Sequence, residues 1–167
     1  YVSLVGDWNK PNPDNDDEDF DYGTVILAKP KEIASANPQD NPLFNLSDGS
    51  GLVGLTFYYV EQNAVFVKKF GYTVYGRQPS TATLKNLTFI NSAYGIGFSL
   101  HNTHNELINI ENVYGTFLYN AIRHNGTTDV GFYDNVNVSL KYWKNAADEF
   151  KCQYPATLKN IVNENLE

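Results

Sequence analysis

The sequence of 167 residues predicts an all-β fold of the solenoid type, in which short parallel strands stack in successive coils. β-prone runs such as residues 52–57 recur through the middle of the chain. Related segments also return at short intervals: residues 90–95 resemble residues 110–115, 20 positions on, and residues 111–113 resemble residues 134–136, 23 positions on. Twelve tyrosines and ten phenylalanines add to this preference because aromatic side chains favour strands.

The expected elements alternate between strands and loops in the first 50 residues. Strands are expected within residues 1–10, 23–28 and 43–46, and loops at residues 11–22 and over most of residues 29–50. Residues 51–143 carry the repeated strands, with a longer insertion at residues 60–80. Each coil of such a solenoid buries one apolar stripe against its neighbours, and asparagines at equivalent turns can pair amide to amide.

The composition changes after Trp143, and residues 144–167 are predicted to be an irregular or helical extension. After Pro155, four apolar residues are spaced as on one face of a helix: Leu158, Ile161, Val162 and Leu166. The alternative is another coil, because residues 156–160 have the same sequence as residues 82–86.

Charge and cysteine content exclude several classes of protein. A net charge of −7, with no cluster of basic residues, argues against a nucleic-acid partner. The single cysteine, Cys152, excludes an internal disulfide, and no apolar run reaches the length of a membrane span. The chain starts at Tyr1 inside a strand-like run and contains no methionine, so we expect a piece of a longer protein.

Several segments in order carry a family resemblance: residues 2–8, 23–26, 51–62, 84–91 and 110–115, and the stretch up to Tyr142-Trp143. They resemble the right-handed parallel β-helix of the pectate-lyase superfamily, in the branch related to pectate lyase 3 and to glycoside hydrolase families 28 and 55. The resemblance covers most of residues 2–143. It implies that residues 1–167 are part of one β-helix domain that is incomplete at both ends, with strand coils at about 2–143.

The same resemblance implies a secreted or cell-surface protein that binds or cleaves polysaccharides. It assigns no catalytic residue, because neither a pectate-lyase calcium cluster nor a polygalacturonase aspartate set can be matched. Gly97 also stands where relatives often have an acidic residue.

Carboxylates are the candidate catalytic residues, because glycoside hydrolysis normally uses two of them. The candidates are Glu61, Glu111, Asp129 and Asp134. Glu111 and Asp134 fall at equivalent points of successive coils, so we expect them to lie near each other on one face. The alternative is that they are ordinary turn or ladder residues.

Candidate substrate-binding residues are Arg123, His124, Tyr59 and Trp143. Arginine can hold a sugar carboxylate with two hydrogen bonds, histidine titrates near neutrality, and aromatic rings can stack on sugars. The alternatives are an exposed turn with a salt bridge for Arg123 and His124, and core packing for the two rings.

Candidate metal ligands are Asp17, Asp19 and Asp21, whose alternate spacing in an acidic loop can direct several oxygens at one Ca²⁺. The alternative is a solvated loop. His101 and His104 have a spacing that suits a turn, but a third ligand is not evident.

Together these features predict a secreted, polysaccharide-degrading glycoside hydrolase or a piece of one. One alternative is a polysaccharide lyase that uses Ca²⁺ and Arg123, and another is a non-catalytic glycan-binding or adhesion module. The expected partners are a polysaccharide or oligosaccharide and, if the chain is a fragment, the remaining coils on another chain.

Overall fold

The computed structural model describes residues 2–12, 23–33, 37–63, 65–77, 79–98, 104–124 and 127–143. These residues form one curled sheet of eight strands, and every strand pairing in it is parallel. The elements are β1 (Ser3–Val5), β2 (Val25–Leu27), β3 (Phe44–Leu46), β4 (Ser50–Tyr58), β5 (Tyr72–Gly76), β6 (Thr81–Phe98), β7 (His104–His124), β8 (Thr127–Val138) and the short 3-10 helix η1 (Leu140–Tyr142). The all-β prediction is confirmed for this part of the chain, and the parallel curled sheet is compatible with a solenoid.

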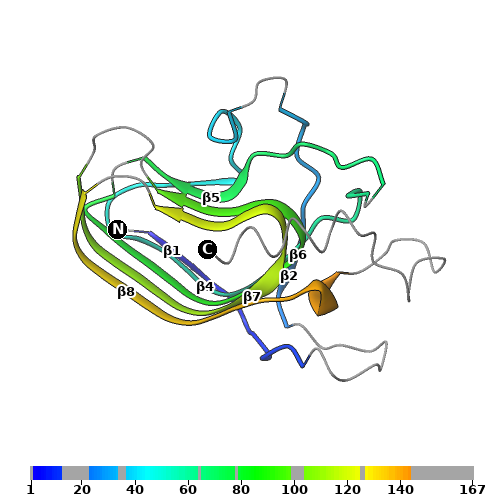
Figure 1. Ribbon diagram of the computed structural model, residues 1–167. Helices are drawn as coiled ribbons and strands as arrows, with labels where there is room; N and C mark the ends of the chain where they lie inside the picture. The colour runs from blue at the N-terminus through cyan, green and yellow to red at the C-terminus, as the bar shows by residue number, and fades with distance from the viewer. Residues whose placement is uncertain are drawn as a thin grey trace.

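The sheet has two arms because β6 and β7 are long and bend (Figure 1). The first arm contains β1, β2, β4, residues 81–90 of β6, residues 104–115 of β7, and β8. The second arm contains β3, β5 and the remaining residues of β6 and β7. The two arms curl towards each other and enclose the core between them.

A ladder of asparagines runs across the first arm. Asn86, Asn112 and Asn135 have positive φ angles of 56°, 55° and 52°, which asparagine tolerates better than most residues. Asn112 Nδ2 donates to Asn86 Oδ1 over 2.8 Å, and Asn135 Nδ2 donates to Asn112 Oδ1 over 2.6 Å. The predicted amide-to-amide pairing of asparagines is therefore confirmed between these neighbouring strands. Each asparagine with a left-handed backbone interrupts the alternation of side chains between the two faces of its strand. Leu84 and Leu87, on either side of Asn86 and three positions apart, are therefore both buried.

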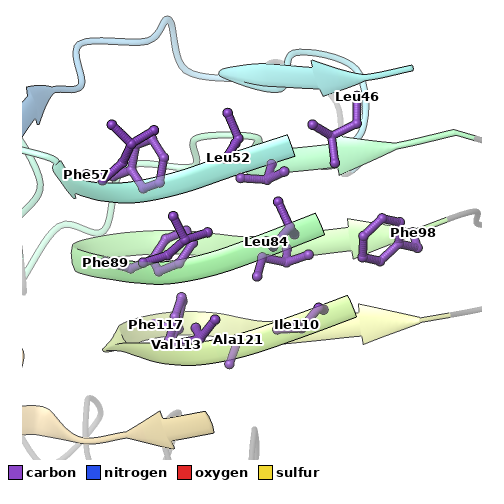
Figure 2. Close-up of a cluster of buried hydrophobic side chains, with 14 of the residues drawn as sticks. Leu46, Leu52, Phe57, Leu84, Phe89, Phe98, Ile110, Val113, Phe117 and Ala121 are labelled. Atoms are coloured by element: carbon purple, nitrogen blue, oxygen red, sulfur yellow. The ribbon is translucent and has the colours of Figure 1, made fainter. Parts of the chain in front are cut away.

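A column of phenylalanines forms the centre of the core (Figure 2). The ring centroids of Phe44 and Phe57 are 5.6 Å apart, those of Phe57 and Phe89 are 5.2 Å apart, and those of Phe89 and Phe117 are 5.1 Å apart. Leu84 of the first arm and Ile96 of the second belong to the same buried cluster. One apolar core therefore holds both arms together through the packing of these side chains.

Both edges of the first arm leave inward apolar side chains partly exposed. Leu4 of β1 is 42% exposed, and Tyr133 and Val136 of β8 are 45% and 38% exposed. In the part of the chain that the structure describes, no strand pairs with the outer edge of β8.

Two sequence expectations need correction. The 20-residue echo is not the strand register: β6 and β7 pair with an offset of 26, so Tyr94 faces Asn120. The 23-residue echo is the true register of β7 and β8, where Glu111 pairs with Asp134. The insertion expected at residues 60–80 contains the strand β5, which the sequence analysis did not predict.

The irregular or helical extension predicted at residues 144–167, which includes Cys152, lies outside the described residues. Among the described residues, no helix has the length and apolarity needed to cross a membrane.

Candidate functional site

The outward face of the second arm is set by the pleat of β5, β6 and β7. Val74 of β5 and Ile96 of β6 pair in register and are both in the core. Their neighbours Tyr75 and Gly97 also pair in register, and Gly97 pairs with Arg123 of β7. Since adjacent residues of a strand point to opposite faces, Tyr75, Gly97 and Arg123 share the face turned away from the core.

Four tyrosines contact one another at this face, and we call them the tyrosine cluster: Tyr72, Tyr75, Tyr94 and Tyr119. Tyr94 and Tyr119 also pack against the apolar core. Tyr72 stacks on Tyr75 with ring centroids 5.8 Å apart, and its ring meets Tyr94 edge-on at 5.4 Å. Tyr94 stacks on Tyr119 with centroids 4.8 Å apart and an interplanar angle of 16°. The rings therefore form a continuous aromatic surface across three strands.

Gly97 makes this packing possible. The ring of Tyr72 lies over Gly97, where a Cβ atom would come within 2.7 Å of the ring carbons. Any other residue at this position would displace the ring. Gly97 thus serves as the base of the tyrosine cluster.

The four rings differ in exposure, and this decides which of them a ligand can contact. Tyr72 and Tyr75 are buried, and Gln39 Oε1 accepts a 3.1 Å hydrogen bond from the Tyr75 hydroxyl. Tyr94 and Tyr119 are half-buried, and Arg123 beside them is exposed. The solvent-facing part of the cluster is therefore the stacked pair Tyr94–Tyr119 with a guanidinium next to it.

Arg123 also influences the pKa values of two tyrosine hydroxyls in the cluster. Burial raises the pKa of Tyr72 and Tyr94, and the positive charge of Arg123 opposes this rise. Both hydroxyls are consequently neutral near pH 7 and can donate hydrogen bonds. The buried Tyr72 hydroxyl has no hydrogen bond of ordinary geometry with a described residue, although the guanidinium is close enough to influence its pKa.

His124, the other half of the predicted Arg123–His124 pair, lies on the opposite face. It pairs in register with the core residue Phe98, its ring centroid is 5.5 Å from that of Phe98, and its Nδ1 contacts the Tyr133 hydroxyl. Burial lowers the pKa of His124. Arg123 and His124 therefore do not act together on one ligand.

The two aromatic residues expected to bind sugar are packed inside the molecule. Tyr59 is 1% exposed, stacks on Phe70, and shares a 2.7 Å hydrogen bond with Thr73. Trp143 is 8% exposed and packs against Leu118. Neither ring offers a free face to a sugar, so the core-packing alternative is correct for both.

Glu61 lies in the loop after β4 and is held by two lysines. Its carboxylate oxygens are 3.8 Å from Lys29 Nζ and 3.5 Å from Lys68 Nζ. All three side chains are at least about one-third exposed. The arrangement is that of a surface ion-pair network, which contributes little to stability when it is exposed.

Glu111 and Asp134 lie next to each other, as expected from their equivalent positions. They pair in register on β7 and β8, on the outward face of the first arm. Lys85 of β6 forms a 2.8 Å ion pair with Glu111. Asp134 is exposed and makes no ion pair with a described residue.

The remaining candidates form no site that the structure describes. Asp129 is exposed on β8. Asp17, Asp19, Asp21 and His101 lie outside the described residues. Within the described ranges, no group of three or more histidine, cysteine, aspartate or glutamate residues could hold a metal ion.

Comparisons with known proteins add no identification: no family model, no curated protein and no solved structure matches this chain. The sequence pattern indicated Arg123 as a candidate but did not distinguish the tyrosine cluster from the aromatic rings of the core. A glycine in one strand with tyrosines in the strands beside it indicates that an aromatic ring lies over the glycine. Only the strand register shows that Gly97 and these tyrosines are neighbours.

Proposed function

We propose that this chain is part of a secreted, carbohydrate-active right-handed parallel β-helix that binds a polysaccharide through the tyrosine cluster and Arg123. The parallel pairing of β4, β6, β7 and β8, with left-handed residues at equivalent points, supports the solenoid part of the proposal. The binding part rests on the outward face of the second arm.

The observation that carries the proposal is the stacked, half-buried pair Tyr94–Tyr119 beside the exposed Arg123. A sugar ring has an apolar face and a rim of hydroxyls, so a site for it combines flat aromatic surface with a few directed polar groups. The neutral tyrosine hydroxyls and the guanidinium supply those groups. Arg123 can bind a carboxylate with two parallel hydrogen bonds, which favours an acidic polysaccharide.

Affinity electrophoresis in gels that contain a polyuronate or a neutral glucan tests this proposal. We expect the polyuronate to retard the chain, and we expect Tyr119→Ala and Arg123→Ala each to weaken that retardation. Lys31→Ala removes one exposed positive charge outside the cluster and is the matched control. Equal loss of binding in Lys31→Ala and Arg123→Ala would show that net charge, not the tyrosine cluster, causes retention.

Glycoside hydrolysis is the second candidate function, and the pairing of Glu111 with Asp134 favours it. Neighbouring strands are about 4.8 Å apart, so two in-register carboxylates can approach the roughly 5 Å separation that retaining glycosidases use. Lys85 holds Glu111 in place, and Asp134 is open to solvent.

Release of reducing ends from a panel of polysaccharides tests the hydrolase candidate. Glu111→Gln and Asp134→Asn should each abolish release, whereas Glu61→Gln, which removes an equally acidic surface residue, should not. If all three variants keep the activity of the unmodified chain, the pair has no catalytic role. A calcium-dependent lyase would instead give an ultraviolet-absorbing product that EDTA suppresses.

A further inference from the structure

The outer edge of β8 has the chemistry of a strand that lacks its neighbour. We propose that residues 156–162 of this chain dock there as a further parallel strand, in register with residues 131–137. This interaction surface is independent of the tyrosine cluster, which lies on the other arm, but it includes Asp134 of the second candidate function.

The apolar surface along this edge is the first argument. Tyr133 and Val136 occupy the same inward positions as Ile110 and Val113 of β7, which are fully buried. Yet Tyr133 is 45% exposed and Val136 is 38% exposed. A docked strand with Leu158 over Tyr133 and Ile161 over Val136 would cover both side chains in the way that β6 and β8 cover β7.

The sequence of the proposed occupant is the second argument. Residues 156–160, Ala-Thr-Leu-Lys-Asn, are identical to residues 82–86, which form the start of β6 and its left-handed asparagine. The ladder asparagines 86, 112 and 135 are separated by 26 and 23 positions, and Asn160 follows Asn135 by 25. The chain between Asn135 and Asn160 is therefore as long as the chain that links the asparagines of adjacent strands.

Polar complementarity is the third argument. Lys85 pairs with Glu111 across β6 and β7 over 2.8 Å, and the proposed register puts Lys159 beside Asp134 in the same way. Asn160 Nδ2 would donate to Asn135 Oδ1, as Asn135 Nδ2 donates to Asn112 Oδ1. Covering this edge also removes a row of unpaired backbone groups that would otherwise recruit strands from other molecules.

Disulfide trapping in the full chain tests the register. In a Cys152→Ser background, Asp134→Cys with Lys159→Cys puts both thiols on one face of adjacent strands, within the Cα separation that a disulfide needs. Asp134→Cys with Leu158→Cys is the matched control, because position 158 then points to the other face. We expect mild oxidation at low protein concentration to close an intramolecular disulfide in the first pair and not in the second.

Three outcomes would overturn the proposal: no cross-link in either pair, equal cross-linking in both pairs, or cross-linked dimers, which would identify a second copy as the occupant. Charge reversal gives a readout without cysteines. Lys159→Glu should lower the urea midpoint of unfolding, and adding Asp134→Lys should restore it. Restoration would support the strand register, and its absence would contradict it.

Discussion

The asparagine ladder can be tested at its central member, Asn112. Alanine at this position must adopt the left-handed conformation, which costs about 1–2 kcal/mol for a residue with a Cβ. It also removes the side-chain hydrogen bonds to Asn86 and Asn135, each with a net value of about 0.5–1.5 kcal/mol. Asn112→Ala should therefore lower the free energy of unfolding by about 2–5 kcal/mol.

Asn112→Gly separates the two contributions. Glycine accepts a positive φ without steric cost but loses the same two amide hydrogen bonds, and its flexible unfolded state offsets part of the gain. We expect Asn112→Gly to be less destabilising than Asn112→Ala by about 1 kcal/mol. Urea unfolding followed by the fluorescence of Trp8 and Trp143 measures both variants. Asn9→Ala, at an exposed asparagine with ordinary backbone angles, is the control and should change stability by less than about 0.5 kcal/mol.

If Asn112→Gly destabilises the chain as much as Asn112→Ala, the left-handed backbone contributes nothing to the cost of losing Asn112, and the expected difference of about 1 kcal/mol is wrong. If both variants match Asn9→Ala, the amide ladder itself is energetically neutral. A change in the steepness of the urea transition would instead show that the arms unfold separately, since the slope follows the surface exposed in one cooperative step.

Three more predictions concern the core, the tyrosine cluster and the histidine beside β8. Phe89→Ala should cost about 3–5 kcal/mol in urea unfolding because Phe89 is fully buried in the phenylalanine column, whereas Phe66→Ala, at a ring that is 79% exposed, should cost under about 0.5 kcal/mol. Gly97→Ala should displace the Tyr72 ring and reduce the near-ultraviolet circular dichroism of the tyrosines, while the far-ultraviolet signal persists. Burial lowers the pKa of His124, so the unfolded chain binds its proton more tightly; stability should fall as the pH drops below about 6.5, and His124→Gln should reduce that fall in pH-dependent urea midpoints.

Local sequence patterns predicted the ladder but only part of the register. The match of Glu111–Val113 with Asp134–Val136 identified the pairing of β7 and β8, because both asparagines need the same left-handed conformation. The 20-residue echo misled because its matching Ile, Tyr and Gly residues do not align the left-handed asparagines. Asn91 of β6 has a positive φ of 60°, but the echo places it opposite Glu111, one residue before Asn112.

The tyrosine cluster depends on a feature that the sequence pattern does not show. The β6–β7 register shifts twice between Phe89 and Tyr94, and Asn91 lies within this irregular stretch. Strict alternation gives Tyr94 no consistent face: counted from the core residue Phe89 it points outward, and counted from the core residue Ile96 it points inward. Which tyrosines face solvent therefore follows from the irregularity, and composition alone could not separate them from buried rings such as Tyr59.

The two candidate functions occupy opposite sides of the molecule, and this limits how they can cooperate. The tyrosine cluster and Arg123 are on the outward face of the second arm, whereas Glu111 and Asp134 are on the outward face of the first, with the shared core between them. One sugar unit cannot contact both faces at once. Arg123 therefore cannot position the bond that Glu111 and Asp134 would cleave, and Arg123→Ala should reduce polysaccharide binding without lowering hydrolysis of a short oligosaccharide at the acidic pair. A joint loss of both activities would mean that one of the two sites has been assigned to the wrong residues.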